Sequence, residues 1–141
     1  MGAATSSNVV GVPPLQVIDW WEEAGPRIQK ALDTIETGYR LEDVAKKILS
    51  QHAQLWVIPG KAAAVTEIHI YPQHKTLVIS FLGGDDMASW FDDMMNVLES
   101  YAKVMECRYI EEYGRPGWER IGNRIGFEKV YTVMRKDLVS E

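Results

Sequence analysis

The residue types best suited to proton transfer lie together in the middle of the chain. Glu67 and His69 are two positions apart, so both side chains point to the same side if this stretch is an extended strand. A carboxylate in such a place could take a proton from a substrate. The pair could equally form the polar rim of a strand face that a helix covers or that solvent reaches. The sequence leaves both interpretations open.

Other familiar catalytic spacings are missing from the sequence. His52, His69 and His74, taken with the single cysteine Cys107, do not reproduce a zinc-ligand pattern, so no metal site is predicted. Cys107 falls between an expected helix and an expected strand, which favours a buried structural thiol over a nucleophile. The sequence contains neither the Gly-x-Ser-x-Gly motif of hydrolases nor the Gly-x-x-x-x-Gly-Lys-Ser/Thr loop of nucleotide-binding proteins.

The composition indicates one soluble globular domain. The chain has 141 residues, of which 46% are hydrophobic and 25% are charged, and its formal net charge is -5. A chain of this sign has no general attraction to nucleic acids or anionic membranes, so neither partner is predicted. A single cysteine allows no intrachain disulfide and favours a reducing, cytoplasmic location. No apolar run reaches the roughly 18 residues that a transmembrane helix needs, and residues 1–12 lack the pattern of a secretory signal.

Changes in hydrophobic period divide the chain into expected helices and strands. Apolar residues recur at helical spacing in some stretches and alternate, as strands do, in others. Glycine accepts the left-handed backbone of a helix cap, so Gly38 and Gly126 are expected to end helices. In order, the sequence predicts a strand at 15–18, a helix that Pro26 opens and Gly38 ends, a helix at 41–49, strands at 54–58, 63–71 and 76–82, a long helix at 87–105, a strand at 107–113, a short helix at 116–125 and a last strand at 127–134.

This order predicts an α/β (α+β) domain with a mixed, mostly antiparallel central sheet flanked by helices. The three middle strands follow one another through short turns, as in an antiparallel meander. A long helix between two strands implies a crossover and therefore one parallel pair. We expect residues 1–12 to be a flexible lead-in, 13–137 to form the domain and 138–141 to be a polar tail.

The most specific pattern lies near the C-terminus. From Gly117 to Phe127 the sequence reads GWERIGNRIGF, a short helix that closes with an apolar residue and Gly-Phe before the last expected strand. Together with the element order, this pattern resembles the GNAT superfamily of N-acetyltransferases over roughly residues 15–135. The resemblance implies the GNAT fold and, if the chain is active, acetyl-CoA as cofactor and an amine as acetyl acceptor.

The resemblance also implies where acetyl-CoA would bind. In the family, a loop of the form Gln/Arg-x-x-Gly-x-Gly/Ala opens the long helix and holds the pyrophosphate through backbone N–H groups and the helix dipole. Here Asp85 and Asp86 lie in the corresponding loop before the long helix, where they would repel a pyrophosphate. Alternatively, Gly83 and Gly84 form a shifted anion cradle and the aspartates face solvent. The candidate cofactor-binding residues are Phe81, Leu82, Gly83, Gly84, Met87, Ala88 and Ser89.

The catalytic residues that the resemblance implies are only partly present. Glu67 matches a general-base glutamate that takes a proton from the amine through water in some members of the family. The family's frequent general acid is a tyrosine four residues before Gly-Phe, and that position is Gly122 here. Tyr131 or Tyr113 could substitute for it. The thioester would lie where the sheet splays between the strands at 76–82 and 107–113, activated by a backbone N–H.

Two groups of residues could bind partners, and a third group has a simpler explanation. Trp20 and Trp21 could anchor an interface, or one ring could belong to the core while charged stems cover the other. Four methionines of the long helix, Met87, Met94, Met95 and Met105, are best explained as core packing. A basic group near the C-terminus could hold an anion or be solvated helix surface, and it consists of Arg115, Arg120, Arg124 and Lys129.

Two hypotheses of function follow. One is an acetyltransferase that acts on an unknown amine. The other is a GNAT-like scaffold with a degraded acetyl-CoA site that works through protein contacts. The chain also resembles small acetyltransferase-like proteins of tailed bacteriophages and prophages, which implies a virion component or an accessory factor in the host cytoplasm. The segment from Gly83 to Ser89 favours the scaffold hypothesis.

Overall fold

A five-stranded sheet forms the middle of the molecule, as a computed structural model that describes residues 8–114 and 117–139 shows. The strand order follows the chain, β1-β2-β3-β4-β5, and the first four strands are antiparallel while β4 and β5 are parallel. The strands are β1 (Val10–Val12), β2 (Gln54–Ile58), β3 (Ala62–Ile70), β4 (Lys75–Gly84) and β5 (Tyr109–Glu112). The sheet is therefore mixed and mostly antiparallel, which confirms the predicted fold class.

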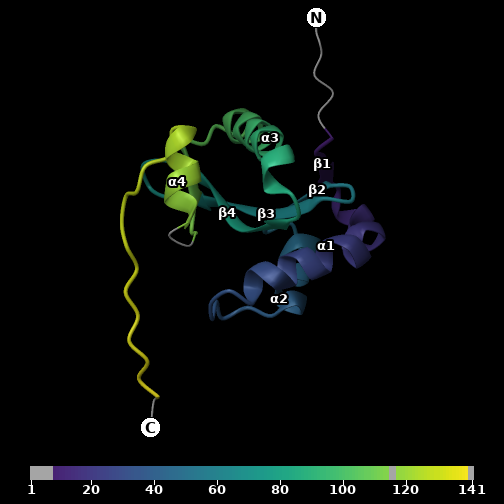
Figure 1. Cartoon of the computed structure of the whole chain (residues 1–141), viewed down its shortest axis with the longest axis horizontal. Coiled ribbons are helices and arrows are strands. Elements are labelled where there is room, and N and C mark those ends of the chain that lie inside the picture. The colour runs from purple at the N-terminus through teal and green to yellow at the C-terminus, as the bar shows by residue number, and fades with distance from the viewer. Residues whose placement is uncertain (1–7, 115–116, 140–141) are drawn as a thin grey trace, which may run out of the picture.

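Helices cover both faces of this sheet, and each face has its own apolar core. In Figure 1, α1 and α2 lie on one side of the sheet and α3 and α4 on the other. Ile28 and Val44 bring α1 and α2 against the first face, and Met94 and Leu98 bring α3 against the second. The helices are α1 (Val17–Leu32), α2 (Leu41–Leu49), α3 (Phe91–Val104) and α4 (Gly117–Arg124), with short 3-10 helices η1 (Pro14–Gln16) and η2 (Met87–Ser89).

The start of the chain differs from the prediction. The strand expected at 15–18 is wrong, because these residues belong to η1 and the first turn of α1. The first strand is instead β1, within the stretch expected to be a lead-in, and it pairs with β2 from Val10 opposite Val57 to Val12 opposite Leu55. A short apolar run does not by itself distinguish a strand from a helix, and here the pairing partner decides.

The first helix begins and ends earlier than predicted: α1 starts at Val17 and stops at Leu32, so the prediction that Gly38 ends it is wrong. Pro26, which was expected to open it, lies inside α1. Proline lacks the N–H that would bond to the carbonyl four residues earlier, so an interior proline disfavours a helix. Here Ala24, Ile28 and Leu32 bury one continuous face of the helix against the sheet, and this packing outweighs the local preference. The second helix, 41–49, agrees with the prediction at both ends.

The end of the chain contains the largest disagreement. The strand predicted at 127–134 is wrong, because this segment pairs with no described strand. It leaves the body of the molecule after α4 as an extended tail (Figure 1). Pro116, predicted to open the short helix, and Arg115 lie outside the described residues. The alternation of β-branched and aromatic residues favours a strand, but a strand also needs hydrogen bonds to a neighbouring strand, and this segment makes none with the described sheet.

Candidate functional site

The end of β4 is the centre of the candidate site. Along β3, Val65 lies opposite Phe81 and Thr66 lies opposite Ile79, so Ser80 is an extra residue that forms a β-bulge. On the other side, the pairing of β4 with β5 stops at Ile79, although β4 continues to Gly84. In an antiparallel pair, alternate residues turn their N–H and C=O away from the partner. Within the described part of the chain, β4 therefore presents main-chain groups beyond the end of β5.

Gly83 and Gly84, the residues of the possible anion cradle, lie at the end of β4. Both are strand residues, paired with Ala63 and Ala62 of β3. A side chain on Gly83 would come within 2.5 Å of the Arg27 carbonyl oxygen in α1, and one on Gly84 would come as close to the Lys61 carbonyl oxygen. These glycines are explained by the close approach of neighbouring backbone, which needs no bound phosphate.

The start of α3 is acidic. Asp85 and Asp86 are exposed and lead into η2, and Asp92 and Asp93 occupy the first turn of the helix. One nearby cation reaches this region, because the Lys61 Nζ atom lies 3.3 Å from the Ser89 Oγ atom. The carboxylates at the helix start already complement the positive end of its dipole.

The other residues of the predicted cofactor loop take structural positions. Phe81 packs toward the core beneath α1 and α2, and Leu82 and Met87 pack toward the core beneath α3. Ala88 and Ser89 are exposed in η2, and the Ser89 hydroxyl donates to the Asp86 carbonyl at 2.7 Å. The segment is continuous from the end of β4 to α3, but the role predicted for it stays a prediction.

Glu67 lies on β3 at the face covered by α2, and three groups converge on its carboxylate. The Lys47 ammonium donates to Oε1 at 2.8 Å and the Ser80 hydroxyl donates to Oε2 at 2.7 Å. The His69 Nε2 atom lies 3.5 Å from Oε1, which confirms that these two side chains share a face. Burial raises the pKa of Glu67, but the hydrogen bonds from Lys47 and Ser80 outweigh it, so the pKa is lowered.

This pairing reduces the basicity of Glu67. A carboxylate with a lowered pKa gives up its proton easily and is a weaker general base at neutral pH. Lys47 is held in turn, because its Nζ atom lies 5.0 Å from the centre of the Tyr39 ring. Burial lowers the pKa of Lys47, yet the bond to Glu67 and its charge raise it overall. Glu67 and Lys47 therefore both keep their charges, and remain an ion pair, at pH values around 7.

The two tyrosines proposed as general acids lie next to each other. The rings of Tyr113 and Tyr131 are 6.4 Å apart, and Tyr113 directly follows the end of β5. A hydrogen bond with Tyr131, together with partial burial, raises the pKa of Tyr113, so the phenol keeps its proton. At the family's usual acid position, Gly122 is buried, and a side chain there would come within 3.0 Å of the Phe127 Cβ atom.

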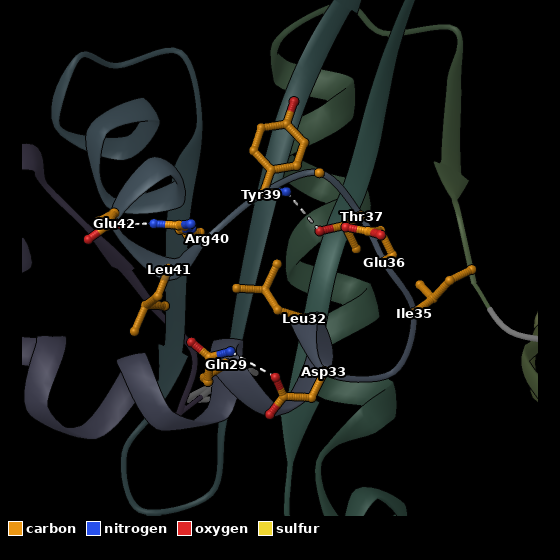
Figure 2. Close-up of a pocket in the computed structure, with 11 residues that line it drawn as sticks. Gln29, Leu32, Asp33, Ile35, Glu36, Thr37, Tyr39, Arg40, Leu41 and Glu42 are labelled. Atoms are coloured by element: carbon orange, nitrogen blue, oxygen red, sulfur yellow. Dashed lines mark hydrogen bonds and ion pairs between the residues drawn. The ribbon is translucent and has the colours of Figure 1, made fainter. Parts of the chain in front are cut away.

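A shallow pocket of about 530 Å³ lies on the connection between α1 and α2. Figure 2 shows Tyr39 at one side of it, above Leu32 and Leu41. Three carboxylates, from Asp33, Glu36 and Glu42, and the guanidinium of Arg40 also line it. The Tyr39 ring contacts Phe81 edge-on at 6.3 Å. The lining is predominantly anionic, so it favours a cationic group such as an amine.

The remaining predicted sites are distributed over the surface. Trp20 and Trp21 are half-buried against the core beneath α1, and Arg120 and Arg124 are exposed on α4. Among the described residues, no group of three or more metal-ligating side chains is placed to hold a metal ion. No helix in that part of the chain is long and apolar enough to cross a membrane.

Sequence reasoning did not find the partners of Glu67. Lys47 and Ser80 are 20 and 13 positions away from it along the chain, and Tyr39 belongs to a connection without a motif. No local spacing links these residues. Only the stacking of α2 on β3 and the bulge of β4 bring them together.

Comparison with known proteins identifies the architecture. No protein-family model and no curated protein matches the chain. A solved structure of a probable acetyltransferase matches 92% of this chain and 98% of its own, with a TM-score of 0.68 at 10% identity. A predicted acetyltransferase with acetyl-CoA from Clostridium acetobutylicum matches 93% of this chain and 96% of its own (TM-score 0.67, 12% identity).

A third match extends the same result to a plant enzyme. Glucosamine-6-phosphate N-acetyltransferase from Arabidopsis thaliana matches 92% of this chain and 97% of its own chain, with a TM-score of 0.66 at 13% identity. Identities this low establish shape and leave the chemistry to be argued from the site. The similarity spans nearly the whole length of each protein, so the chain has the fold of the GNAT acetyltransferases.

Proposed function

We propose that this chain is a GNAT-fold protein that has lost ordinary acetyl-CoA binding and acts through protein contacts. The observation that carries the proposal is the acidic start of α3, with Asp85, Asp86, Asp92 and Asp93 around the place where a pyrophosphate would bind. The residues present do not fit a doubly charged anion. The Lys61 ammonium, 3.3 Å from the Ser89 Oγ atom, offsets only part of the charge of the four carboxylates.

The expected size of this effect follows from Coulomb's law. Two unit charges about 6 Å apart in water repel by roughly 0.7 kcal/mol, and salt reduces this further. Four exposed carboxylates facing a pyrophosphate therefore oppose binding by about 2 to 4 kcal/mol in all, which corresponds to roughly a hundredfold in affinity. The dipole at a helix N-terminus stabilises a bound anion by only about 0.3 to 1 kcal/mol, which is less than this repulsion.

Two further observations support a loss of catalysis. Gly122 stands at the position of the usual general acid, and it has no side chain that could donate a proton. Glu67 is held by Lys47 and Ser80, and its lowered pKa makes it a poor proton acceptor. We therefore infer that the loop for the cofactor, the general acid and the general base are each poorly suited to acetyl transfer.

The proposal is tested by isothermal titration of the chain with acetyl-CoA and with CoA. We expect a dissociation constant weaker than about 10 μM, which corresponds to roughly 7 kcal/mol. Tighter binding by the natural sequence would overturn the proposal.

A double substitution tests the electrostatic cause. Asp86 has a positive φ of 54°, a conformation that asparagine tolerates, so Asp85→Asn with Asp86→Asn removes two charges without strain. CoA affinity is expected to rise about tenfold and to depend on salt. Asp19→Asn with Glu22→Gln in α1 removes the same charge elsewhere and should not change it. If both pairs behave alike, repulsion at the start of α3 is not the cause.

Active acetyl transfer is the second candidate, and the open edge of β4 favours it. The bulge at Ser80 and the β4 residues beyond Ile79, which pair with β3 but not with β5, present main-chain groups beside an anionic pocket suited to an amine. Glu67 as base and Tyr131 or Tyr113 as acid would then be the predicted catalytic residues. Release of free CoA from acetyl-CoA in the presence of amines, lost in Glu67→Gln, would establish this candidate.

The biological setting remains a separate prediction. The resemblance to phage and prophage proteins predicts a virion component or an accessory factor with a protein partner. Mass spectrometry of purified virions from a phage that encodes the chain would test that setting.

A further inference from the structure

A second pocket, of about 470 Å³, lies at the end of the sheet where β2 begins and β3 ends. The pairing of β2 with β3 stops at Gln54 and Thr66, although β3 continues to Ile70. Beyond Thr66, β2 therefore leaves one side of β3 without a neighbour among the described strands, and Ile68 and Ile70 of that stretch line the pocket. The volume falls in the range of about 300 to 1,000 Å³ that small-molecule sites occupy.

The walls of this pocket are mainly apolar and come from both layers of the molecule. Val12 and Ile48 belong to the layer beneath α1 and α2, and Ile68 and Tyr101 belong to the layer beneath α3. Ile70, which also lines the pocket, is 77% exposed. A ligand with a chain of methylene groups would remove this apolar surface from water, which is favourable.

Lys75 supplies a positive charge to the pocket. It is half-buried and lines the pocket, and its ammonium makes no ion pair or hydrogen bond with any described residue. The Cys107 thiol does not neutralise it. Burial raises the pKa of Cys107, against the Lys75 charge that lowers it, so the thiol keeps its proton at neutral pH. A half-buried ammonium without a counter-ion favours the binding of an anion.

Tyr101 adds a hydrogen-bond donor near this charge. Burial, and after it the neighbouring Cys107, raises the pKa of Tyr101, so the phenol keeps its proton. The Tyr101 ring is held edge-on against Trp56, with the ring centres 5.0 Å apart. An ammonium and a phenol beside apolar walls are complementary to a carboxylate at the end of an apolar chain.

We propose that this pocket binds a free medium-chain fatty acid, with the carboxylate at Lys75 and the chain along Ile68 and Ile70. Lys75 is the first residue of β4, whereas the segment predicted to bind acetyl-CoA starts at Phe81, near the other end of that strand. The fatty acid therefore binds away from the predicted cofactor site, and its binding is independent of whether the chain binds acetyl-CoA.

The first test is isothermal titration of the full chain with sodium decanoate, at concentrations too low for micelles. We expect a dissociation constant of about 100 μM. Octanoate and hexanoate should bind more weakly, by about two- to fourfold for each methylene group removed. Decanol has the same chain without the charge and should bind about tenfold more weakly than decanoate. A dissociation constant for decanoate weaker than about 1 mM, or equal binding of decanol, overturns the proposal.

The second test concerns the charge. Lys75→Gln keeps most of the side chain and removes the ammonium, so it should weaken decanoate binding about tenfold and leave decanol binding unchanged. Lys103→Gln is the matched control, because Lys103 is an exposed lysine of α3 that does not line the pocket. Equal losses in the two variants would mean that only the net charge matters, and they would overturn the contact with Lys75.

The third test locates the chain of the fatty acid. Ile70→Trp places a large ring in the pocket and should abolish decanoate binding. Ile18→Trp is its control, because Ile18 is 80% exposed on α1 and does not line the pocket. Urea denaturation shows that both variants fold. Parental affinity in a folded Ile70→Trp variant overturns the proposal.

A peptide distinguishes the fatty acid from a protein C-terminus. An acetylated peptide that ends in three leucines presents a carboxylate and apolar groups of the same kind, and we expect it to bind more weakly than decanoate. Tighter binding of the peptide would identify a protein C-terminus as the occupant, and the assignment to a fatty acid would then be wrong.

Discussion

Glu67 is the clearest case of a single residue whose behaviour depends on its neighbours. Its side chain is 16% exposed and makes a 2.8 Å ion pair with Lys47, whose side chain is 29% exposed. Since the pKa of Glu67 is lowered from 4.5, the pair contributes stability that is present above pH 4.5 and lost as the pH falls through the folded value. The pKa of Lys47 is raised from 10.5. The contribution of the pair is therefore fully present below pH 10.5 and is lost as the pH rises through the pKa of Lys47 in the folded protein.

Replacement of Glu67 by glutamine should therefore make the free energy of unfolding less dependent on pH in acid solution. We expect Glu67→Gln to lower the free energy of unfolding by about 1 to 2 kcal/mol at pH 7 and to reduce its decline below pH 4.5. Urea denaturation at several pH values measures this. Glu42→Gln is the matched control, because the Arg40–Glu42 pair is 3.8 Å apart and exposed, and such pairs contribute little. Equal effects of the two variants would contradict the account.

Gly83 provides a second prediction at this scale. A Cβ atom there would meet the Arg27 carbonyl oxygen at 2.5 Å, so Gly83→Ala must displace α1 from the end of β4. Overpacking of this kind costs about 1 to 3 kcal/mol. Gly117→Ala is the control, because the space around Gly117 is open within 4 Å. A denaturation midpoint that shifts no more for Gly83→Ala than for the control would show that the backbone contact is not rigid.

Among the elements, α4 is the one whose end is most fully specified. Gly126 has a φ of +95°, and the Phe127 N–H donates to the Gly122 carbonyl at 2.9 Å. These are the features of a Schellman motif. They confirm the glycine cap predicted from the sequence, and Phe127 contacts Trp118 of the same helix.

Gly126→Ala should destabilise the chain by about 1 kcal/mol, because a Cβ atom disfavours the left-handed backbone. Nothing lies within 4 Å of that Cβ atom, so the cost is conformational and not steric. Gly126→Asn should cost less, since asparagine visits this conformation more readily. Thermal unfolding of the three proteins decides the order. A variant Gly126→Ala as stable as the parent would remove the cap from the account of this helix.

The whole molecule consists of two apolar layers, one on each face of the sheet, and a tail that belongs to neither. The first layer lies under α1 and α2, and the second lies under α3 and α4. The tail is the only described segment beyond α4, and most of its apolar side chains are exposed. The stability of the molecule thus depends mainly on these two layers.

The sequence by itself determined the order of most elements. The helix at 41–49 and the strand at 54–58 agree with the structure at both ends, because each combines a clear period with terminal turn signals. The faces of β3 were also determined, since alternation places Val65 and Ala64 in opposite layers. The resemblance to the GNAT fold rested on this order together with the Gly126-Phe127 pattern.

Only the tertiary structure decided those features that depend on residues far apart in the sequence. Val10–Val12 is a strand because β2 lies beside it, and residues 127–134 are not a strand because no described strand edge meets them. Pro26 remains inside α1 because the sheet buries one side of that helix. Glu67 was visible in the sequence, but Lys47 and Ser80 reach it only after folding. Pairing and ion-pair energies depend on distance in space, and residue spacing along the chain does not contain that distance.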